Sequence, residues 1–145
     1  MNSNRMIGGA IEQMLATHPR PSELPRQLLT ECVEACVICA TTCTACADAC
    51  LAEKEVTHLL DCIRTNLDCA EICQATGNML VRQTGSVWQQ LYRQVETCQL
   101  ACNVCGPVCE SHADMHEHCR ICADVCRDCV RACTRLLETF PARTQ

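Results

Sequence analysis

The stretch CVEACVICATTCTACADAC, residues 32–50, places six thiols in one short segment. The steps between consecutive cysteines alternate between four and three residues, which is the spacing of side chains along one face of an α-helix. The six residues are Cys32, Cys36, Cys39, Cys43, Cys46 and Cys50. Thiolates are soft ligands that bind Cu(I), zinc and iron–sulfur clusters. The segment therefore predicts a helix with one face lined by metal-binding groups.

The same spacing recurs in three later segments, so the cysteines form a repeat. The second segment is sparser, with Asn66 between its first two cysteines. The later cysteines are Cys62, Cys69 and Cys73; Cys98, Cys102, Cys105 and Cys109; and Cys119, Cys122, Cys126, Cys129 and Cys133. Alternating steps of three and four mark the side of a bundle helix that faces the bundle axis. We therefore expect all eighteen cysteines of this 145-residue chain to face one core.

The elements that position these thiols are predicted to be helices only. Cysteine and apolar spacing predicts helices at about 25–53, 55–83, 87–112 and 114–139, after a short helix at 5–18 and a segment with three prolines. Ser86 with Gln89, and Asp114 with Glu117, have the spacing of capping boxes at two helix starts. Short connections make neighbouring helices antiparallel. The expected fold is all-α, an antiparallel up-down-up-down four-helix bundle (25–145) with a short N-terminal helical arm (1–24).

A sulfur-lined core needs something to fill it, because small side chains alone pack a bundle poorly. Helix positions four apart have Cβ atoms about 5–6 Å apart, whereas a disulfide needs about 3.5–4.5 Å. A linear sulfur–metal–sulfur unit spans about 4.6 Å and fits better. A continuous column of thiolates favours Cu(I), on the order of one ion per cysteine, since each ion neutralises one thiolate. Zinc tetrahedra and iron–sulfur clusters remain alternatives, and CNVCGPVC at 102–109 loosely resembles a cluster motif.

The strings CVEACVIC, CQLACNVC and CADVCRDC together resemble the bacterial copper storage proteins, in particular their cytosolic branch. The resemblance covers about residues 25–139. It implies a four-helix bundle that binds many Cu(I) ions per chain, a homotetramer, and a store rather than an enzyme. The alternative is an iron–sulfur or zinc-binding cysteine-rich protein with a redox or metal-buffering role.

An antiparallel bundle has two different ends. One end is predicted to be closed by apolar side chains: Leu28, Leu29, Leu80, Trp88, Leu91, Val95, Leu136 and Phe140. The opposite end, here called the mouth, gathers histidines beside the last cysteines. We expect four residues to act there as additional metal ligands during uptake: His58, His112, Met115 and His118. His116 lies in the same group, and its role is left open.

Composition narrows the class of protein further. No export signal or run of membrane-spanning length is evident, so we expect a cytoplasmic protein whose thiols stay reduced. A net charge of −5, the absence of a basic run and three aromatic residues argue against nucleic-acid binding. The expected partners are copper ions and a copper chaperone or chelator.

Overall fold

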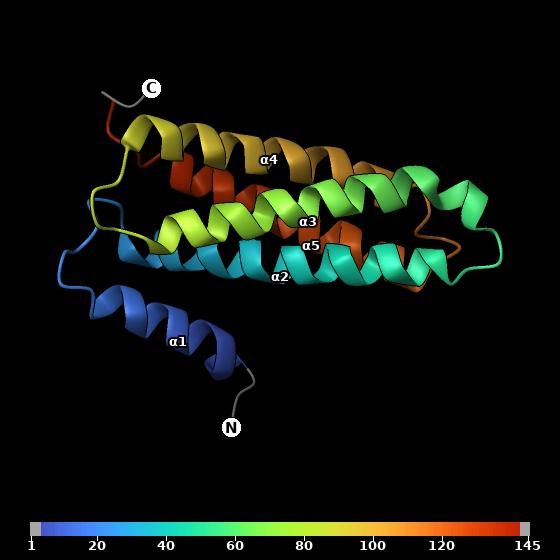
Figure 1. Cartoon of the computed structure of the whole chain (residues 1–145), viewed down its shortest axis with the longest axis horizontal. Coiled ribbons are helices and arrows are strands. Elements are labelled where there is room, and N and C mark those ends of the chain that lie inside the picture. The colour runs from blue at the N-terminus through green and yellow to red at the C-terminus, as the bar shows by residue number, and fades with distance from the viewer. Residues whose placement is uncertain (1–3, 143–145) are drawn as a thin grey trace.

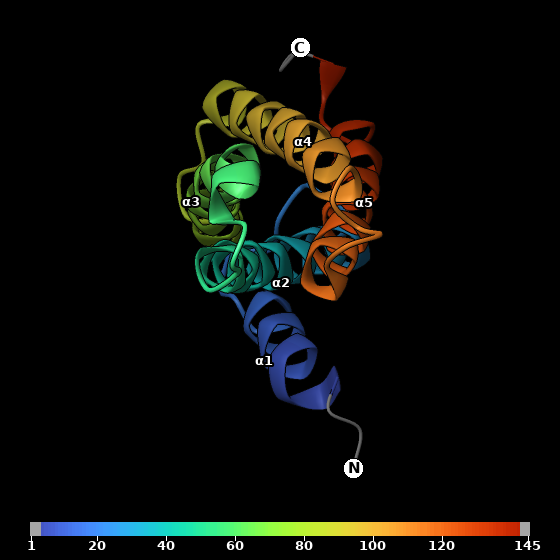
Figure 2. The same ribbon diagram turned by 90° about the vertical axis from the view of Figure 1, so that its right-hand side faces the viewer.

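The computed structural model describes residues 4–142, with side chains from residue 9 onward. It contains α1 (Asn4–Ala16), α2 (Arg26–Leu51), the short 3-10 helix η1 (Val56–Leu59), α3 (Leu60–Val81), α4 (Trp88–Glu110) and α5 (Glu117–Leu137). Helices α2 to α5 run side by side along the long axis (Figure 1). Viewed along that axis they surround a common centre, and α1 lies outside them beside α2 (Figure 2). The predicted all-helical bundle is confirmed.

The helix directions follow from which cysteines meet. The sulfur of Cys32, near the start of α2, lies 3.9 Å from that of Cys133, near the end of α5. At the other end of the same pair, the sulfurs of Cys50 and Cys119 are 4.0 Å apart. Helices α2 and α5 are therefore antiparallel. The α2–α3 and α4–α5 connections lie together at the right-hand end of Figure 1, and the α3–α4 connection lies at the left.

The predicted capping boxes are wrong. The N-cap of α4 is Val87, the N-cap of α5 is His116, and neither helix start has a side-chain capping hydrogen bond. The Ser86 hydroxyl instead donates to the carbonyl of Arg82, at 3.4 Å. Gly85, with φ of +69°, turns the chain just before it, so Ser86 faces the end of α3. Packing of the cysteine-lined helix faces contributes more free energy than a single capping hydrogen bond. This packing therefore decides where the two helices begin.

The closed end is apolar, as predicted. The side chains of Leu29, Leu80, Val95 and Leu136 are at most 1% exposed. The ring of Phe140 forms T-shaped contacts with the rings of Trp88 and Tyr92, whose centroids lie 6.0 and 5.3 Å away. Each fully buried large apolar side chain stabilises the fold by about 1.5–3 kcal/mol. This end gives the bundle a core that does not depend on metal.

Helix α2 is long and apolar enough, by length and composition alone, to cross a membrane, with a mean hydropathy of 1.5 over its best window. The expectation that no segment approaches such a length was therefore wrong. The hydropathy has a local cause, because eleven of its 26 residues, including all six of its cysteines, are buried in the bundle. Core helices of globular proteins pass the same test.

Candidate metal centre

All eighteen cysteines are free thiols in the bundle interior, and none is more than 2% exposed. Helix α2 supplies six of them, α3 three, α4 four and α5 five. The string CNVCGPVC lies entirely within α4, with Pro107 inside the helix. Its cysteines therefore belong to the same inward row as the others, and not to a cluster-binding loop.

Neighbouring sulfurs are spaced for metal bridges. The sulfurs of Cys43 and Cys122 are 3.6 Å apart, and those of Cys39 and Cys126 are 4.0 Å apart. A disulfide would require about 2.05 Å. With bonds of about 2.3 Å, a metal ion needs its sulfurs about 4.0 Å apart in a trigonal site and about 4.6 Å apart in a linear one. The column accepts such ions after small outward movements of the thiols.

The sulfurs form overlapping groups and not isolated sets. Within each group, all ligand atoms lie within 4.8 Å of one another. Four of the groups are Cys36, Cys98, Cys129 and Cys133; Cys39, Cys69, Cys73 and Cys102; Cys39, Cys43, Cys69 and Cys126; and Cys43, Cys105, Cys122 and Cys126. Several cysteines, such as Cys39 and Cys43, belong to two groups. Shared sulfurs suit bridged Cu(I) better than separate zinc tetrahedra.

Asn66 is the one amide within this sulfur column among the described residues, and it is 0% exposed. Its Oδ1 accepts hydrogen bonds from the thiols of Cys105 (3.0 Å), Cys122 (3.1 Å) and Cys109 (3.3 Å). Its Nδ2 donates to the sulfur of Cys62 at 3.4 Å. Asn66 therefore ties three helices of the bundle together at the position where the cysteine repeat is interrupted.

Of the thiols nearest the mouth, those of Cys50 and Cys119 are held in their neutral form, whereas hydrogen bonds from neighbouring thiols, first that of Cys109, lower the pKa of Cys46. Burial, together with the charge of Cys46, raises the pKa of Cys50 to about 11. Burial also raises the pKa of Cys119 well above its usual value. Neutral thiols tolerate a closed core, whereas unpaired thiolates there would be very costly. Metal binding at these sulfurs must therefore release protons.

One predicted mouth ligand meets the sulfur column directly. The Nδ1 atom of His118 lies 3.5 Å from the sulfur of Cys46, 3.6 Å from that of Cys119 and 4.0 Å from that of Cys50. These four residues form another group whose ligand atoms lie within 4.8 Å of one another. His118 thus extends the row of sulfurs by one nitrogen.

The other three predicted mouth ligands lie around the rim. His58 belongs to η1, its side chain is 76% exposed, and its Nδ1 lies 4.0 Å from a carboxylate oxygen of Glu55. Met115 is 71% exposed, and His112 is half-buried just beyond α4. The structure therefore places all four residues at the predicted end. Among the hydrogen bonds of residues 9–142, however, only His118 of these four contacts cysteine sulfurs.

Sequence reasoning missed Glu53. Its carboxylate oxygen Oε2 lies 2.5 Å from Nδ1 of His116 and 3.8 Å from Nε2 of His118. Its position, three residues after Cys50, is the signal that could have identified it, since residues three apart share a helix face.

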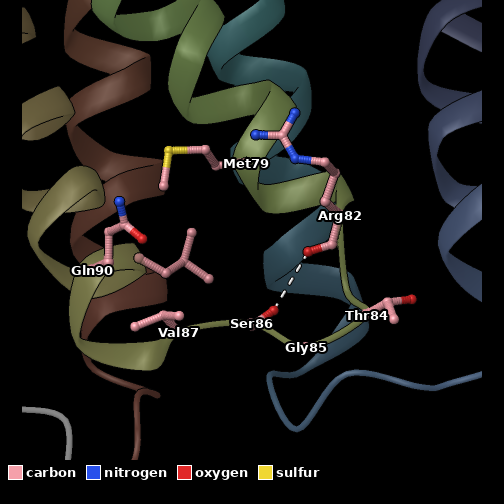
Figure 3. A pocket seen from close by; sticks show the side chains of 8 residues that line it. Met79, Arg82, Thr84, Gly85, Ser86, Val87 and Gln90 are labelled. Carbon is pink, nitrogen blue, oxygen red and sulfur yellow. Dashed lines mark hydrogen bonds between the residues drawn. The ribbon is translucent and has the colours of Figure 1, made fainter.

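A surface hollow of about 220 Å³ lies at the closed end, where α3 leads into α4. Its lining includes Met79, Arg82 and Gln90, and the Ser86–Arg82 hydrogen bond crosses its wall (Figure 3). It is separate from the sulfur column and from the mouth.

Comparison with known proteins identifies the family. The copper storage protein family profile matches residues 25–138. The copper storage protein Ccsp of Streptomyces lividans, in a structure loaded with 10 copper equivalents, is 44% identical with a TM-score of 0.87, and the match covers 89% of this chain and 98% of that one. A cytosolic copper storage protein from Streptomyces lividans, in a structure with five coppers, is 42% identical with a TM-score of 0.74, and the match covers 90% of this chain and 97% of that one. The uncharacterized cysteine-rich protein YhjQ of Bacillus subtilis strain 168 is 36% identical over 90 residues, which are 60% of this chain and 75% of YhjQ. The family match begins and ends within one residue of the bundle itself, and this chain belongs to the copper storage protein family.

Proposed function

We propose that this protein stores Cu(I) on the thiolates of its eighteen core cysteines, as a binding protein and not as an enzyme. The observation that carries the proposal is the continuous column of buried free thiols, with neighbouring sulfurs 3.6–4.0 Å apart from Cys32 and Cys133 to Cys50 and Cys119. A catalytic cysteine must reach a substrate. These sulfurs are sealed from solvent, which suits storage.

The charge balance sets the expected capacity. If each ion takes two sulfurs and each sulfur bridges two ions, the column holds about one Cu(I) per cysteine, on the order of 18 per chain. Each ion then replaces one thiol proton, so the loaded core stays neutral. Ccsp, the relative described above, has been loaded with 10 copper equivalents, which supports a capacity of many ions.

The mouth is the proposed route of uptake. His118 offers a nitrogen to an incoming ion beside the first three sulfurs, and the rim residues His58, His112 and Met115 offer further soft or borderline ligands outside it. The apolar packing of the opposite end supports this direction, because the fully buried side chains of Leu29, Leu80 and Leu136 close that end.

The biological setting follows the family. We propose that residues 25–145 form the storage unit and 1–24 an accessory arm, that the protein works in the cytoplasm as a homotetramer, and that it exchanges copper with a chaperone or chelator. The 42% identical relative from Streptomyces lividans is described as a cytosolic copper storage protein, which supports the compartment.

The test is anaerobic titration of the reduced protein with Cu(I), followed by elemental analysis. Saturation near one Cu(I) per cysteine supports the proposal. Saturation at about four or five ions would instead indicate tetrahedral clusters and contradict it. A brown protein as purified would indicate iron–sulfur clusters, because Cu(I) thiolates are colourless.

A further inference from the structure

We propose that Glu53 is a positioning residue, which holds His118 in the tautomer that presents the lone pair of Nδ1 to copper. The inference rests on the proposed function in taking His118 as the first ligand that an ion meets.

The position of Glu53 is set by the end of α2. Its backbone N–H donates to the carbonyl of Cys50 at 3.2 Å, so the chain keeps a helical turn there and the carboxylate lies just beyond the last cysteine of α2. From this position Oε2 faces two imidazole rings, those of His116 and His118. The two rings stack, with centroids 5.4 Å apart and planes 23° apart. One carboxylate thus serves both rings.

The two ring nitrogens of His118 have different surroundings. Nδ1 faces the three sulfurs, as described above. Nε2 is buried and has no hydrogen-bond partner within the described part of the chain, and the carboxylate oxygen Oε2 of Glu53 lies 3.8 Å from it. A neutral imidazole carries its proton on one nitrogen and a lone pair on the other. A carboxylate beside Nε2 attracts the proton to that nitrogen, which leaves Nδ1 free to bind a metal ion.

The opposite tautomer would block uptake. It would direct an N–H from Nδ1 at the sulfurs of Cys46 and Cys119, and would set the Nε2 lone pair against the Glu53 carboxylate. The distance of 3.8 Å is longer than a hydrogen bond, so we expect Glu53 to move about 1 Å toward His118 when an ion binds. His116, whose Nδ1 lies 2.5 Å from the same carboxylate oxygen and whose ring stacks on His118, limits the movement of both rings.

A simple surface ion pair is the competing explanation. Exposed ion pairs contribute little to stability, because solvent screens them and ordering the side chains costs entropy. The side chains at the mouth are more buried than those of an exposed ion pair: His116 is 16% exposed and Glu53 is 33% exposed. Glu117, by contrast, lies between the two histidines in sequence, but its 69%-exposed carboxylate faces Arg120. It is a matched control, because its removal takes the same charge from the mouth without touching either ring.

The first experiment uses reduced, copper-free protein. Long-range ¹H–¹⁵N NMR spectra of the imidazole rings distinguish the two tautomers. We expect His118 to carry its proton on Nε2 in the wild type and in E117Q, and to shift toward the Nδ1-protonated form in E53Q. E53D, which keeps a carboxylate, should retain the wild-type tautomer and serves if E53Q does not fold. An unchanged His118 tautomer in E53Q, or an Nδ1-protonated ring in the wild type, would overturn the proposal.

The second experiment measures copper uptake by stopped flow against a coloured Cu(I) chelator. Loss of a residue that orients a metal-binding histidine typically weakens binding about 10–100-fold, so the first uptake phase of E53Q should slow by about that factor. The final capacity should be unchanged. Equal slowing in E117Q would show that mouth charge, and not ring positioning, is responsible. A low capacity in the wild type would refute copper storage itself. The NMR result would still test the His118 tautomer, because that experiment uses copper-free protein.

Discussion

Replacing Cys43 and Cys126 together with alanine should lower copper capacity without slowing uptake. Both residues lie deep in the column, away from the mouth, and both are 0% exposed. The sulfur of Cys43 lies 3.6 Å from that of Cys122, 3.8 Å from that of Cys39 and 3.9 Å from that of Cys126. The pair is therefore at a junction of the sulfur network and not at its edge.

The size of the effect follows from how the groups overlap. Two of the four-sulfur groups named above contain both Cys43 and Cys126, so the double variant halves each of those two. With one Cu(I) per cysteine, the double variant should lose about two ions out of roughly 18. If each of the two affected groups loses one further ion, the loss rises to about four. The alanines also leave two small voids, which should cost about 1 kcal/mol each in folding free energy.

The assay is anaerobic titration with elemental analysis, together with the stopped-flow uptake measurement. The variant V95A is the control, because it truncates a fully buried side chain at the closed end and removes no sulfur. It should keep full capacity. Undiminished capacity in C43A/C126A would refute the assignment of these thiols as ligands. Loss of more than half the capacity would show that the column binds copper as one cooperative unit and not as overlapping groups.

Three further predictions concern the mouth, the empty protein and the buried amide. Replacing the mouth histidines together with alanine should slow uptake and removal while leaving capacity nearly unchanged, because thiolates hold the stored ions; equal stopped-flow rates would contradict the mouth as the route. The four are His58, His112, His116 and His118. Copper-free reduced protein should already be helical, since the apolar end folds without metal, and circular dichroism showing little helix would contradict this. N66A should lower the free energy of unfolding of the copper-free protein by about 2–3 kcal/mol, through a void and three thiols that lose their acceptor. N66L, which fills the space and affects only weak thiol donors, should cost less, and urea unfolding in which N66L is the less stable variant would refute this reasoning.

The cysteine spacing by itself determined the helices, their inward faces and the soft-metal chemistry of the core. These features are local, because a period of 3.6 residues fixes which side chains share a helix face before any neighbour is present. Short connections then leave little choice of helix direction. Apolar residues at one end and histidines at the other were assigned to the correct ends for the same reason.

Only the tertiary structure decided what happens where the helices end and meet. The capping boxes failed because interhelical packing, and not one hydrogen bond, sets the starts of α4 and α5. The amide of Asn66 reaches thiols on α4 and α5, which its place in α3 does not reveal. At the mouth, four candidate ligands looked alike in sequence, yet His118 alone among them turns a ring nitrogen to the sulfurs, and Glu53 approaches it from the connection that follows α2. Such contacts depend on the rotation and reach of side chains across helix ends, which local periodicity leaves undetermined.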